Sequence, residues 1–163
     1  MRFFGIKLPQ PVIIKSRTMT TDQLILRTID RWEGGLSAHP LDRGGVTKYG
    51  ITKRWYPGED IVNLTKERAV AILRRDYWKP LAVDNLHPRA GWKAFDAAVV
   101  GGPSLGRRVK DIFLSSPDIE IGMTVAVDFL KNHFTRIAER DAKQQVFLKG
   151  WLRRAADRGE EIC

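Results

Sequence analysis

The sequence predicts a mainly α-helical fold that carries one small β-hairpin. Apolar side chains recur at spacings of three and four residues through most of the chain after residue 19, which is the period of an amphipathic helix. One glycine-rich segment, at residues 44–56, is instead rich in strand-favouring residues. With 163 residues, of which 43% are hydrophobic, the chain is long enough to bury a sizeable core.

The first predicted helix begins after Thr20. Thr20 and Gln23 have the spacing of a capping box, in which each side chain bonds a free backbone donor of the first turn. Gly34 and Gly35 are expected to end the helix, because glycine takes the left-handed conformation without steric cost. Glu33 therefore falls in the last turn. The apolar face of this helix consists of Leu24, Ile25, Thr28, Ile29 and Trp32.

The predicted hairpin follows the first helix and carries two polar residues of interest. Gly44 and Gly45 are expected to form its turn, and Gly50 allows close approach of the backbone to a neighbour. Asp42 and Thr47 lie on this segment, so the hairpin returns them toward the end of the helix. The strand-favouring residues are Val46, Tyr49, Ile51, Trp55 and Tyr56.

The rest of the chain is predicted to be helical almost throughout. Pro80 is expected to end the second helix, and Ser104 to cap the fourth. Pro88 suits the first turn of the third helix, where its missing N–H costs nothing. The expected helices after the hairpin cover residues 65–79, 88–100, 104–114, 122–140 and 141–158.

The chemistry suggested by these positions is glycoside cleavage. The partial negative charge of a helix C-terminus disfavours a carboxylate by about 0.3 to 1 kcal/mol, and burial beside Trp32 acts in the same direction. Both effects favour a protonated acid at Glu33, which makes it the candidate general acid for a leaving sugar oxygen. Asp42 supplies a second carboxylate that holds a water or stabilises an oxocarbenium-like centre, and Thr47 is placed to position that water.

Each of these residues also has an ordinary structural interpretation. A lone Glu at a helix end is most often a solvated surface acid, and an Asp before an Arg-Gly-Gly run is most often a turn former. A Thr in a strand is most often present for its branched side chain. The combination of Glu33, Asp42 and Thr47 at this spacing favours the catalytic interpretation over the three separate ones.

At these residues the chain resembles the N-acetylmuramidases of glycoside hydrolase family 108, which include phage endolysins with a lysozyme-like helical fold. The resemblance extends over residues 20–102 and rests on three motifs in order. They are Glu33-Gly34-Gly35, the pattern Asp-x-Gly-Gly-x-Thr-x-x-Gly-Ile-Thr from residue 42, and Asp76-Tyr77-Trp78. A later stretch, residues 147–154, resembles the end of the peptidoglycan-binding region that often follows the catalytic part of such proteins.

The resemblance implies that the chain is divided into regions with different functions. Residues 1–18 are expected to form an N-terminal arm, or an upstream extension if Met19 is the true start. Residues 19–102 are expected to form the lysozyme-like catalytic region. Residues 103–163 are expected to form a helical region like a peptidoglycan-binding domain, packed with the catalytic region into one compact unit. Glu33 is then the catalytic acid, with Asp42 and Thr47 beside it, and the substrate contacts are expected at Tyr49, Gly45 and Trp55.

Charge and composition agree with an anionic polymer as the partner. The chain has 28 Lys and Arg against 19 Asp and Glu, a net charge of +9. Peptidoglycan glycan strands are the expected substrate, and the basic surface also suits outer-membrane lipopolysaccharide. The single cysteine, Cys163, excludes an intramolecular disulfide. His39, His87 and His133 lack metal-ligand spacing, so no metal and no cofactor are expected.

The first eighteen residues begin like a secretory signal but do not continue as one. Lys7, Pro9 and Pro11 interrupt a short apolar run, and no small-residue cleavage site follows. No segment approaches the roughly 20 apolar residues of a membrane span. The resemblance therefore implies synthesis in the host bacterial cytoplasm and release to the periplasm or cell wall through a holin-type pore. We expect a monomer that does not act on nucleic acid.

Three functions remain open at this level. The first is a muramidase that hydrolyses the β-1,4 bond between N-acetylmuramic acid and N-acetylglucosamine, by retention or inversion. The second is a lytic transglycosylase, which uses a Glu on a similar fold but needs no second carboxylate, and against which Asp42 stands. The third is a non-catalytic basic module that binds cell wall or nucleic acid. It is suggested by the pairs Arg74-Arg75, Arg107-Arg108 and Arg153-Arg154, although paired basic residues on helices usually form a solvated face.

Overall fold

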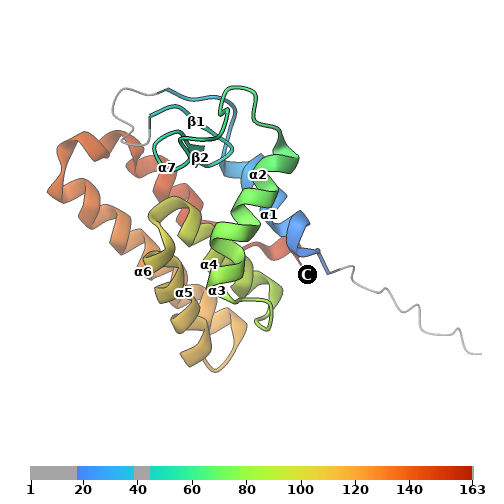
Figure 1. Cartoon of the computed structure of the whole chain (residues 1–163). Coiled ribbons are helices and arrows are strands. Elements are labelled where there is room, and N and C mark those ends of the chain that lie inside the picture. The colour runs from blue at the N-terminus through green and yellow to red at the C-terminus, as the bar shows by residue number, and fades with distance from the viewer. Residues whose placement is uncertain (1–17, 39–44, 163) are drawn as a thin grey trace, which may run out of the picture.

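The computed structural model describes residues 18–38 and 45–162, and it groups helices around a central one with a small sheet at one end (Figure 1). The predicted mainly α-helical fold with one small hairpin is confirmed. The α-helices are α1 (Thr21–Trp32), α2 (Lys66–Leu73), α3 (Lys79–Leu81), α4 (Pro88–Gly101), α5 (Pro103–Ser115), α6 (Ile119–Arg140) and α7 (Gln145–Ala156). The shorter elements are the strands β1 (Thr47–Lys48) and β2 (Ile51–Thr52), the π-helical turn η1 (Arg74–Trp78), and the 3-10 turns η2 (Ala142–Gln144) and η3 (Glu160–Ile162).

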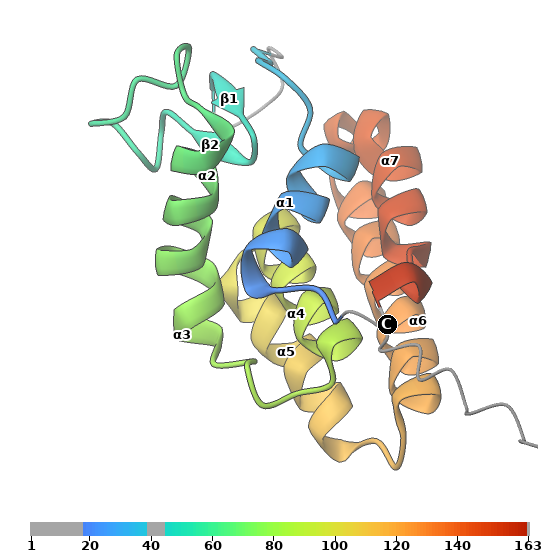
Figure 2. The ribbon, with the colours of Figure 1, turned by 90° about the vertical axis from the view of Figure 1, so that its right-hand side faces the viewer.

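Helix α1 lies between two groups of helices. In Figure 2 the helices α2 and α3 stand on one side of it and α6 and α7 on the other, with the hairpin beside the upper end of α2. One hydrophobic core joins residues from both sides, from Leu24 on α1 to Ile162 at the end of the described chain. Among the described residues, no helix is both long and apolar enough to span a bilayer. The functional division at residue 102 stays a prediction.

Helix α1 begins as predicted but ends differently. The Thr20 side chain accepts a hydrogen bond from the backbone N–H of Gln23 at 3.3 Å, and the Gln23 side chain accepts one from the backbone N–H of Thr20 at 2.8 Å. The expected left-handed stop is wrong, because neither Gly34 nor Gly35 has a positive φ. The chain instead leaves the helix at Glu33, whose φ of −99° and ψ of 78° turn the backbone out of the helical path.

The hairpin turns five residues later than predicted. Strands β1 and β2 are antiparallel with Lys48 opposite Ile51, so the loop consists of Tyr49 and Gly50 alone. Both loop residues have positive φ, 54° and 79°, as a type I′ turn requires, and that turn matches the twist of paired strands. The predicted strand conformation of Tyr49 is therefore wrong.

The two ends of the hairpin segment also differ from the prediction. Trp55 and Tyr56 lie beyond β2 and are not in a strand. Gly45 precedes β1 with a φ of 74°. Gly44, the other residue of the predicted turn, lies outside the described residues. Ser37 and Thr47 exchange two backbone hydrogen bonds of 2.8 Å, which bind the segment after α1 to β1. The hairpin is thereby brought next to the end of α1.

The second predicted helix continues past Pro80. Helix α2 passes into the wider turn η1, where the N–H of Lys79 bonds the carbonyl of Arg74, and then into α3. Pro80 sits in the first turn of α3, where its missing N–H is tolerated, so the expected stop at residue 79 is wrong. The helix ends instead at Ala82, which is left-handed with a φ of 51°.

The Asp-Tyr-Trp motif in η1 has a structural role. The Tyr56 hydroxyl donates a hydrogen bond of 3.0 Å to Asp76, which ties the segment after the hairpin to η1. Burial and this bond raise the pKa of Tyr56 well above its ordinary value. Trp78 packs on Phe95 with ring centroids 5.4 Å apart, and its indole N–H donates to Asp84 at 2.7 Å. The motif therefore connects the hairpin side of the molecule to α4.

Helix α4 is the buried centre of the fold and starts at Pro88 as predicted. Helix α5 packs closely along it, because a Cβ at Gly106 would lie only 2.8 Å from the carbonyl oxygen of Ala94. The predicted cap of α5 is wrong. Gly102, with a φ of 89°, stands at the start of α5, and Ser104 lies inside the first turn. Glycine reaches that conformation without strain, so no side-chain cap is needed at this junction.

Helices α6 and α7 form the C-terminal side. Helix α6 starts three residues earlier than predicted, because the Asp118 side chain accepts hydrogen bonds of 2.9 Å from the backbone N–H groups of Glu120 and Ile121. The last predicted helix, 141–158, is divided. Asp141 is extended with a φ of −137°, and η2 follows it before α7 begins.

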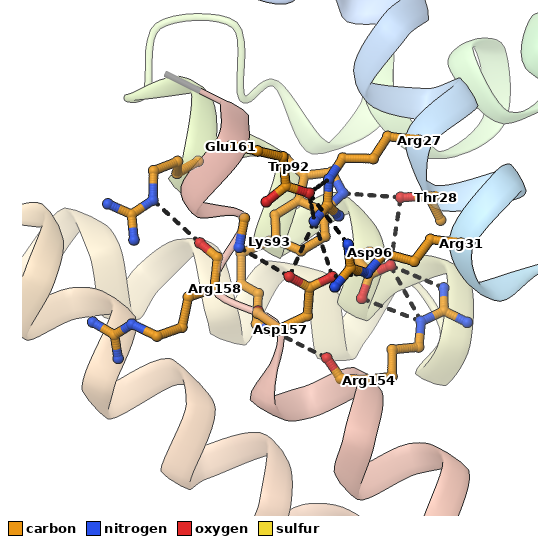
Figure 3. A network of polar contacts seen from close by, with 12 residues as sticks. Arg27, Thr28, Arg31, Trp92, Lys93, Asp96, Arg154, Asp157, Arg158 and Glu161 are labelled. Carbon is orange, nitrogen blue, oxygen red and sulfur yellow. Dashed lines mark hydrogen bonds and ion pairs between the residues drawn. The ribbon is translucent and has the colours of Figure 1, made fainter.

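The end of α7 is held by two independent sets of polar contacts. Lys93 on α4 is fully buried and lies beside Asp157 (Figure 3). Its ammonium donates to the carbonyl oxygens of Ala155 at 2.8 Å and Asp157 at 2.6 Å. Burial lowers the pKa of Lys93 to about 8 although Asp96 and Asp157 oppose the change. Arg27 on α1 forms an ion pair with Asp157 at 3.0 Å. Helix α7 is thus fixed to both α1 and α4.

Candidate active site

The candidate acid lies where α1 meets the hairpin. Glu33 follows α1 directly, and its backbone N–H still donates to the carbonyl of Ile29 at 3.1 Å. Its side chain is 16% exposed. Gly50 of the hairpin loop packs against it, since a Cβ at this position would lie 3.3 Å from both Cγ and Cδ of Glu33. The close backbone approach predicted at Gly50 is confirmed, and its neighbour is Glu33.

Arg154, on the last turn of α7, reaches the same carboxylate from the opposite side. Its Nη1 lies 2.5 Å from Oε1 of Glu33, across 121 residues of sequence. Charge-assisted hydrogen bonds of this kind are among the strong ones in proteins. The carboxyl group of Glu33 is therefore held between the hairpin loop and α7.

A cleft of about 890 Å³ opens beside Glu33. Four parts of the chain contribute to its lining: the end of α1 with residues 34–37, the hairpin, the end of α4 at Val99 and Val100, and the side of α7 that includes Gly150 and Trp151. The size is in the range of ligand-binding clefts, which measure about 300 to 1,000 Å³. The cleft thus lies between segments that are more than a hundred residues apart in sequence.

The lining of the cleft combines aromatic and basic groups. Trp32 has guanidinium groups near its ring, with Arg31 at 5.4 Å and Arg153 at 5.8 Å from the centroid. Trp151 on the opposite wall is stacked on Phe134, with centroids 5.2 Å apart. Among the described lining residues Glu33 is the single carboxylate. A neutral sugar chain with anionic substituents matches such a lining, because rings stack on sugar faces and arginines meet carboxylates.

The comparison with known protein families agrees with this geometry. Residues 26–102 match the family model of glycosyl hydrolase 108. This segment of the chain belongs to that family. The matched segment runs from α1 to the residue after α4 and includes Glu33 and Thr47, whereas α7 lies outside it. No curated protein and no solved structure matches the chain.

Membership of family 108 decides the coarse function. The chain is a glycoside hydrolase that acts on peptidoglycan, and its mainly α-helical fold is lysozyme-like. A basic module without catalysis, which the sequence left open, is not what this family represents. A C-terminal peptidoglycan-binding domain stays a prediction, since the match ends at residue 102.

The structure places some of the predicted site residues of this hydrolase together. Thr47 and Tyr49 line the cleft with Glu33, and the Thr47 hydroxyl donates to the carbonyl oxygen of Gly45 at 3.1 Å. Gly45 and Trp55 are not among the described lining residues, and Trp55 is 71% exposed. Asp42 lies outside the described residues.

Sequence reasoning missed Arg154 as a site residue. The pair Arg153-Arg154 suggested a solvated basic face, which describes the exposed Arg153 but is wrong for Arg154, whose residue is only 7% exposed. A signal was present in α4. Asp96 stands among small and apolar residues of a helix that is buried on nearly every side, and a buried carboxylate needs a cation.

The described residues contain no cluster of metal-binding side chains. Within residues 18–38 and 45–162, no three His, Cys, Asp or Glu side chains gather in a group able to hold an ion. The expectation that the enzyme uses no metal or cofactor stays a prediction.

Proposed function

We propose that this family 108 hydrolase is an N-acetylmuramidase of the endolysin type. It cleaves the β-1,4 bond between N-acetylmuramic acid and N-acetylglucosamine, with Glu33 as the general acid. The observation that carries the proposal is the position of Glu33, a partly exposed carboxyl group in the wall of the cleft and the single one among its described lining residues.

The proton transfer can be assigned to one oxygen of Glu33. Arg154 engages Oε1, so Oε2 is the oxygen that we assign to the leaving sugar. A glycan that fills the cleft displaces water and brings its glycosidic oxygen beside this oxygen. Glu33 then gives its proton to the glycosidic oxygen as the bond to the muramic acid carbon breaks.

The second half of the reaction needs a water and a second carboxylate. We assign the carboxylate to Asp42 and the positioning of the water to Thr47, which lies on β1 in the wall of the cleft. A separation of the two carboxyl groups of about 5 to 5.5 Å implies retention, and one of about 6.5 to 9.5 Å implies inversion. Analysis of the anomer first formed distinguishes the two.

Binding of the glycan is assigned to the aromatic and basic residues of the two walls. We assign the stacking on sugar rings to Trp32, Tyr49 and Trp151, which all line the cleft. Arg153 is exposed beside Trp32 and suits the carboxylates that peptidoglycan carries on its muramic acid substituents. Gly45 and Trp55, outside the described lining, are not needed for this mode of binding.

The experiment is the digestion of purified peptidoglycan by wild type and Glu33→Gln, with mass spectrometry of the released fragments. We expect fragments that end in reducing N-acetylmuramic acid from the wild type, and a loss of about 100- to 10,000-fold in the variant. Glu67→Gln is the matched control, because Glu67 is an exposed acid in the first turn of α2, away from the cleft.

Each other outcome has a definite meaning. Anhydro-muramic acid ends would identify a lytic transglycosylase and overturn the proposed hydrolysis. Full activity of Glu33→Gln, with a melting temperature equal to that of the wild type, would refute Glu33 as the acid. Equal losses in Glu33→Gln and Glu67→Gln would point to damage to the fold.

The cellular setting is part of the same proposal. We expect synthesis in the host cytoplasm, release through a holin-type pore and action as a monomer on the wall. The net charge of +9 suits attraction to anionic lipopolysaccharide as well as to peptidoglycan. Turbidity clearing of permeabilised Gram-negative cells, compared with intact cells, measures how far the enzyme depends on such release.

A further inference from the structure

A buried chain of polar contacts leads from the centre of the fold to Glu33. Arg154 contacts two carboxylates, Glu33 on one side and Asp96 on the other. The guanidinium side chain is 9% exposed and that of Asp96 is 3% exposed. Asp96 belongs to α4 and Arg154 to α7 (Figure 3). Glu33 follows α1 directly, so three helices meet in this one set of contacts.

Asp96 fixes the guanidinium in one orientation. The Nε of Arg154 donates to both carboxylate oxygens of Asp96 at 3.2 Å, and Nη2 lies 3.0 Å from Oδ1. A planar guanidinium that shares two of its nitrogens with one carboxylate has little freedom to rotate. The remaining nitrogen, Nη1, is therefore directed at Glu33.

Asp96 is itself held from behind. The indole N–H of Trp92 donates to the Thr28 hydroxyl at 3.0 Å, and that hydroxyl donates to Oδ1 of Asp96 at 3.4 Å. Thr28 and Trp92 are fully buried. The chain of contacts thus begins in the core, where packing allows little movement, and ends at the cleft.

The guanidinium keeps its charge in this environment. Burial alone would lower its pKa, but the carboxylates of Asp96 and Glu33 outweigh burial and hold the pKa of Arg154 above its ordinary value. Because Arg154 stays charged, it connects the two carboxylates by ion pairs and does not exchange protons with them. Loss of one partner leaves buried charge without compensation, which is costly.

We propose that Arg154 and Asp96 are positioning residues for the hydrolysis. Asp96 orients the guanidinium, and the guanidinium holds Oε1 of Glu33 so that Oε2 faces the glycosidic oxygen. This inference rests on the proposed role of Glu33 as the acid. It also assigns part of the catalytic machinery to α7, beyond the segment that matches family 108.

A merely structural role for Arg154 can be separated from positioning because α7 has other anchors. Lys93 and Arg27 hold the end of this helix through Ala155 and Asp157. Arg27 is the natural control, since its side chain is as buried as that of Arg154, at 7% exposed, and it forms an α1–α7 ion pair that does not involve Glu33. Arg27→Met should lower stability and leave kcat unchanged.

The experiment measures kcat and KM on a soluble peptidoglycan fragment, together with the melting temperature. It compares Arg154→Met, Arg154→Lys, Asp96→Asn and Arg27→Met, all assayed well below their melting temperatures. We expect kcat of Arg154→Met to fall about 100-fold with KM changed by less than about threefold, since a displacement of about 1 Å is enough for such a loss. Arg154→Lys should recover part of kcat because it keeps a cation.

The double variant Arg154→Met with Asp96→Asn tests the order of the contacts. If Asp96 acts through Arg154, kcat of the double variant equals that of Arg154→Met, and the two losses do not multiply. Losses that multiply would overturn the role of Asp96. If Arg154→Met does not fold, Arg154→Lys and Asp96→Asn carry the test through the same comparison of kcat with KM.

Two results overturn the inference while leaving the proposed function intact. One is full kcat in Arg154→Met when Glu33→Gln is inactive. The other is the same loss of kcat in Arg27→Met as in Arg154→Met, which would show that any α1–α7 ion pair has this effect. An active Glu33→Gln, by contrast, refutes the proposed function itself.

Discussion

The buried ammonium of Lys93 gives stability an unusual dependence on pH. Its three hydrogen bonds all go to carbonyl oxygens at the end of α7, from Arg154, Ala155 and Asp157. Burial lowers its pKa from the ordinary 10.5 to about 8. Because the pKa of the folded protein is the lower one, the unfolded chain holds more protons between pH 8 and 10.5. The contribution of Lys93 to the free energy of unfolding therefore rises with pH in this window and is lost as the pH falls through it.

The magnitude follows from the size of the change in pKa. A shift of about 2.5 units at about 1.4 kcal/mol per unit gives about 3 kcal/mol across the window. Urea unfolding of wild type and Lys93→Met at pH 7, 8, 9 and 10 measures it, because subtraction of the two curves removes groups that titrate equally in both proteins. We expect the stability of the wild type relative to the variant to increase by most of this amount between pH 7 and 10.

The opposite pH dependence would refute the reasoning. A difference between wild type and Lys93→Met that stays constant would mean that the three carbonyl oxygens stabilise the charged ammonium as much as burial destabilises it. A difference that shrinks as the pH rises would mean that the carbonyl oxygens outweigh burial.

Three further predictions concern α1 and the hairpin. Thr20→Ala removes half of the capping box and should cost about 0.5 to 2 kcal/mol of unfolding free energy, measured by urea, with no change in kcat. Gly50→Ala adds a methyl 3.3 Å from the Glu33 side chain at a φ of 79°, so stability should fall by about 1 to 2 kcal/mol and activity on peptidoglycan should fall further than in Thr20→Ala. Asp42→Asn and Thr47→Ala should reduce activity with little change in melting temperature, and collapse of both melting temperatures would favour their structural interpretation.

Local rules predicted the parts of the fold that depend on nearest neighbours. The capping box of Thr20 and Gln23 and the start of α4 at Pro88 are contained within a few residues, and both are confirmed. The predicted position of the hairpin loop is wrong because the segment contains two pairs of residues that suit a tight turn. Gly44 with Gly45 fits the local rules better than Tyr49 with Gly50, which form the loop. Pairing with Ser37 and contact with Glu33 decide the register, and neither contact is visible in a short window.

The site residues also differ in whether local sequence is enough to predict them. Glu33 could be proposed from the sequence because a helix end and a motif mark it, whereas Arg154 was missed because its partners lie 58 and 121 residues away. Its neighbour Arg153 has the same side chain and the opposite environment, exposed at the cleft. The two side chains leave α7 on different sides, so the orientation of the helix about its own axis decides which of them is buried. That orientation is set by tertiary packing, which an isolated basic pair cannot report.

Trp32 gives this enzyme an optical probe at the place where chemistry is proposed. Its ring lies in the wall of the cleft within 6 Å of two guanidinium groups, and indole emission is sensitive to such charges and to water. A sugar that stacks on the ring or moves Arg153 away changes both. The difference in fluorescence between the wild type and Trp32→Phe would therefore follow occupation of the cleft in real time.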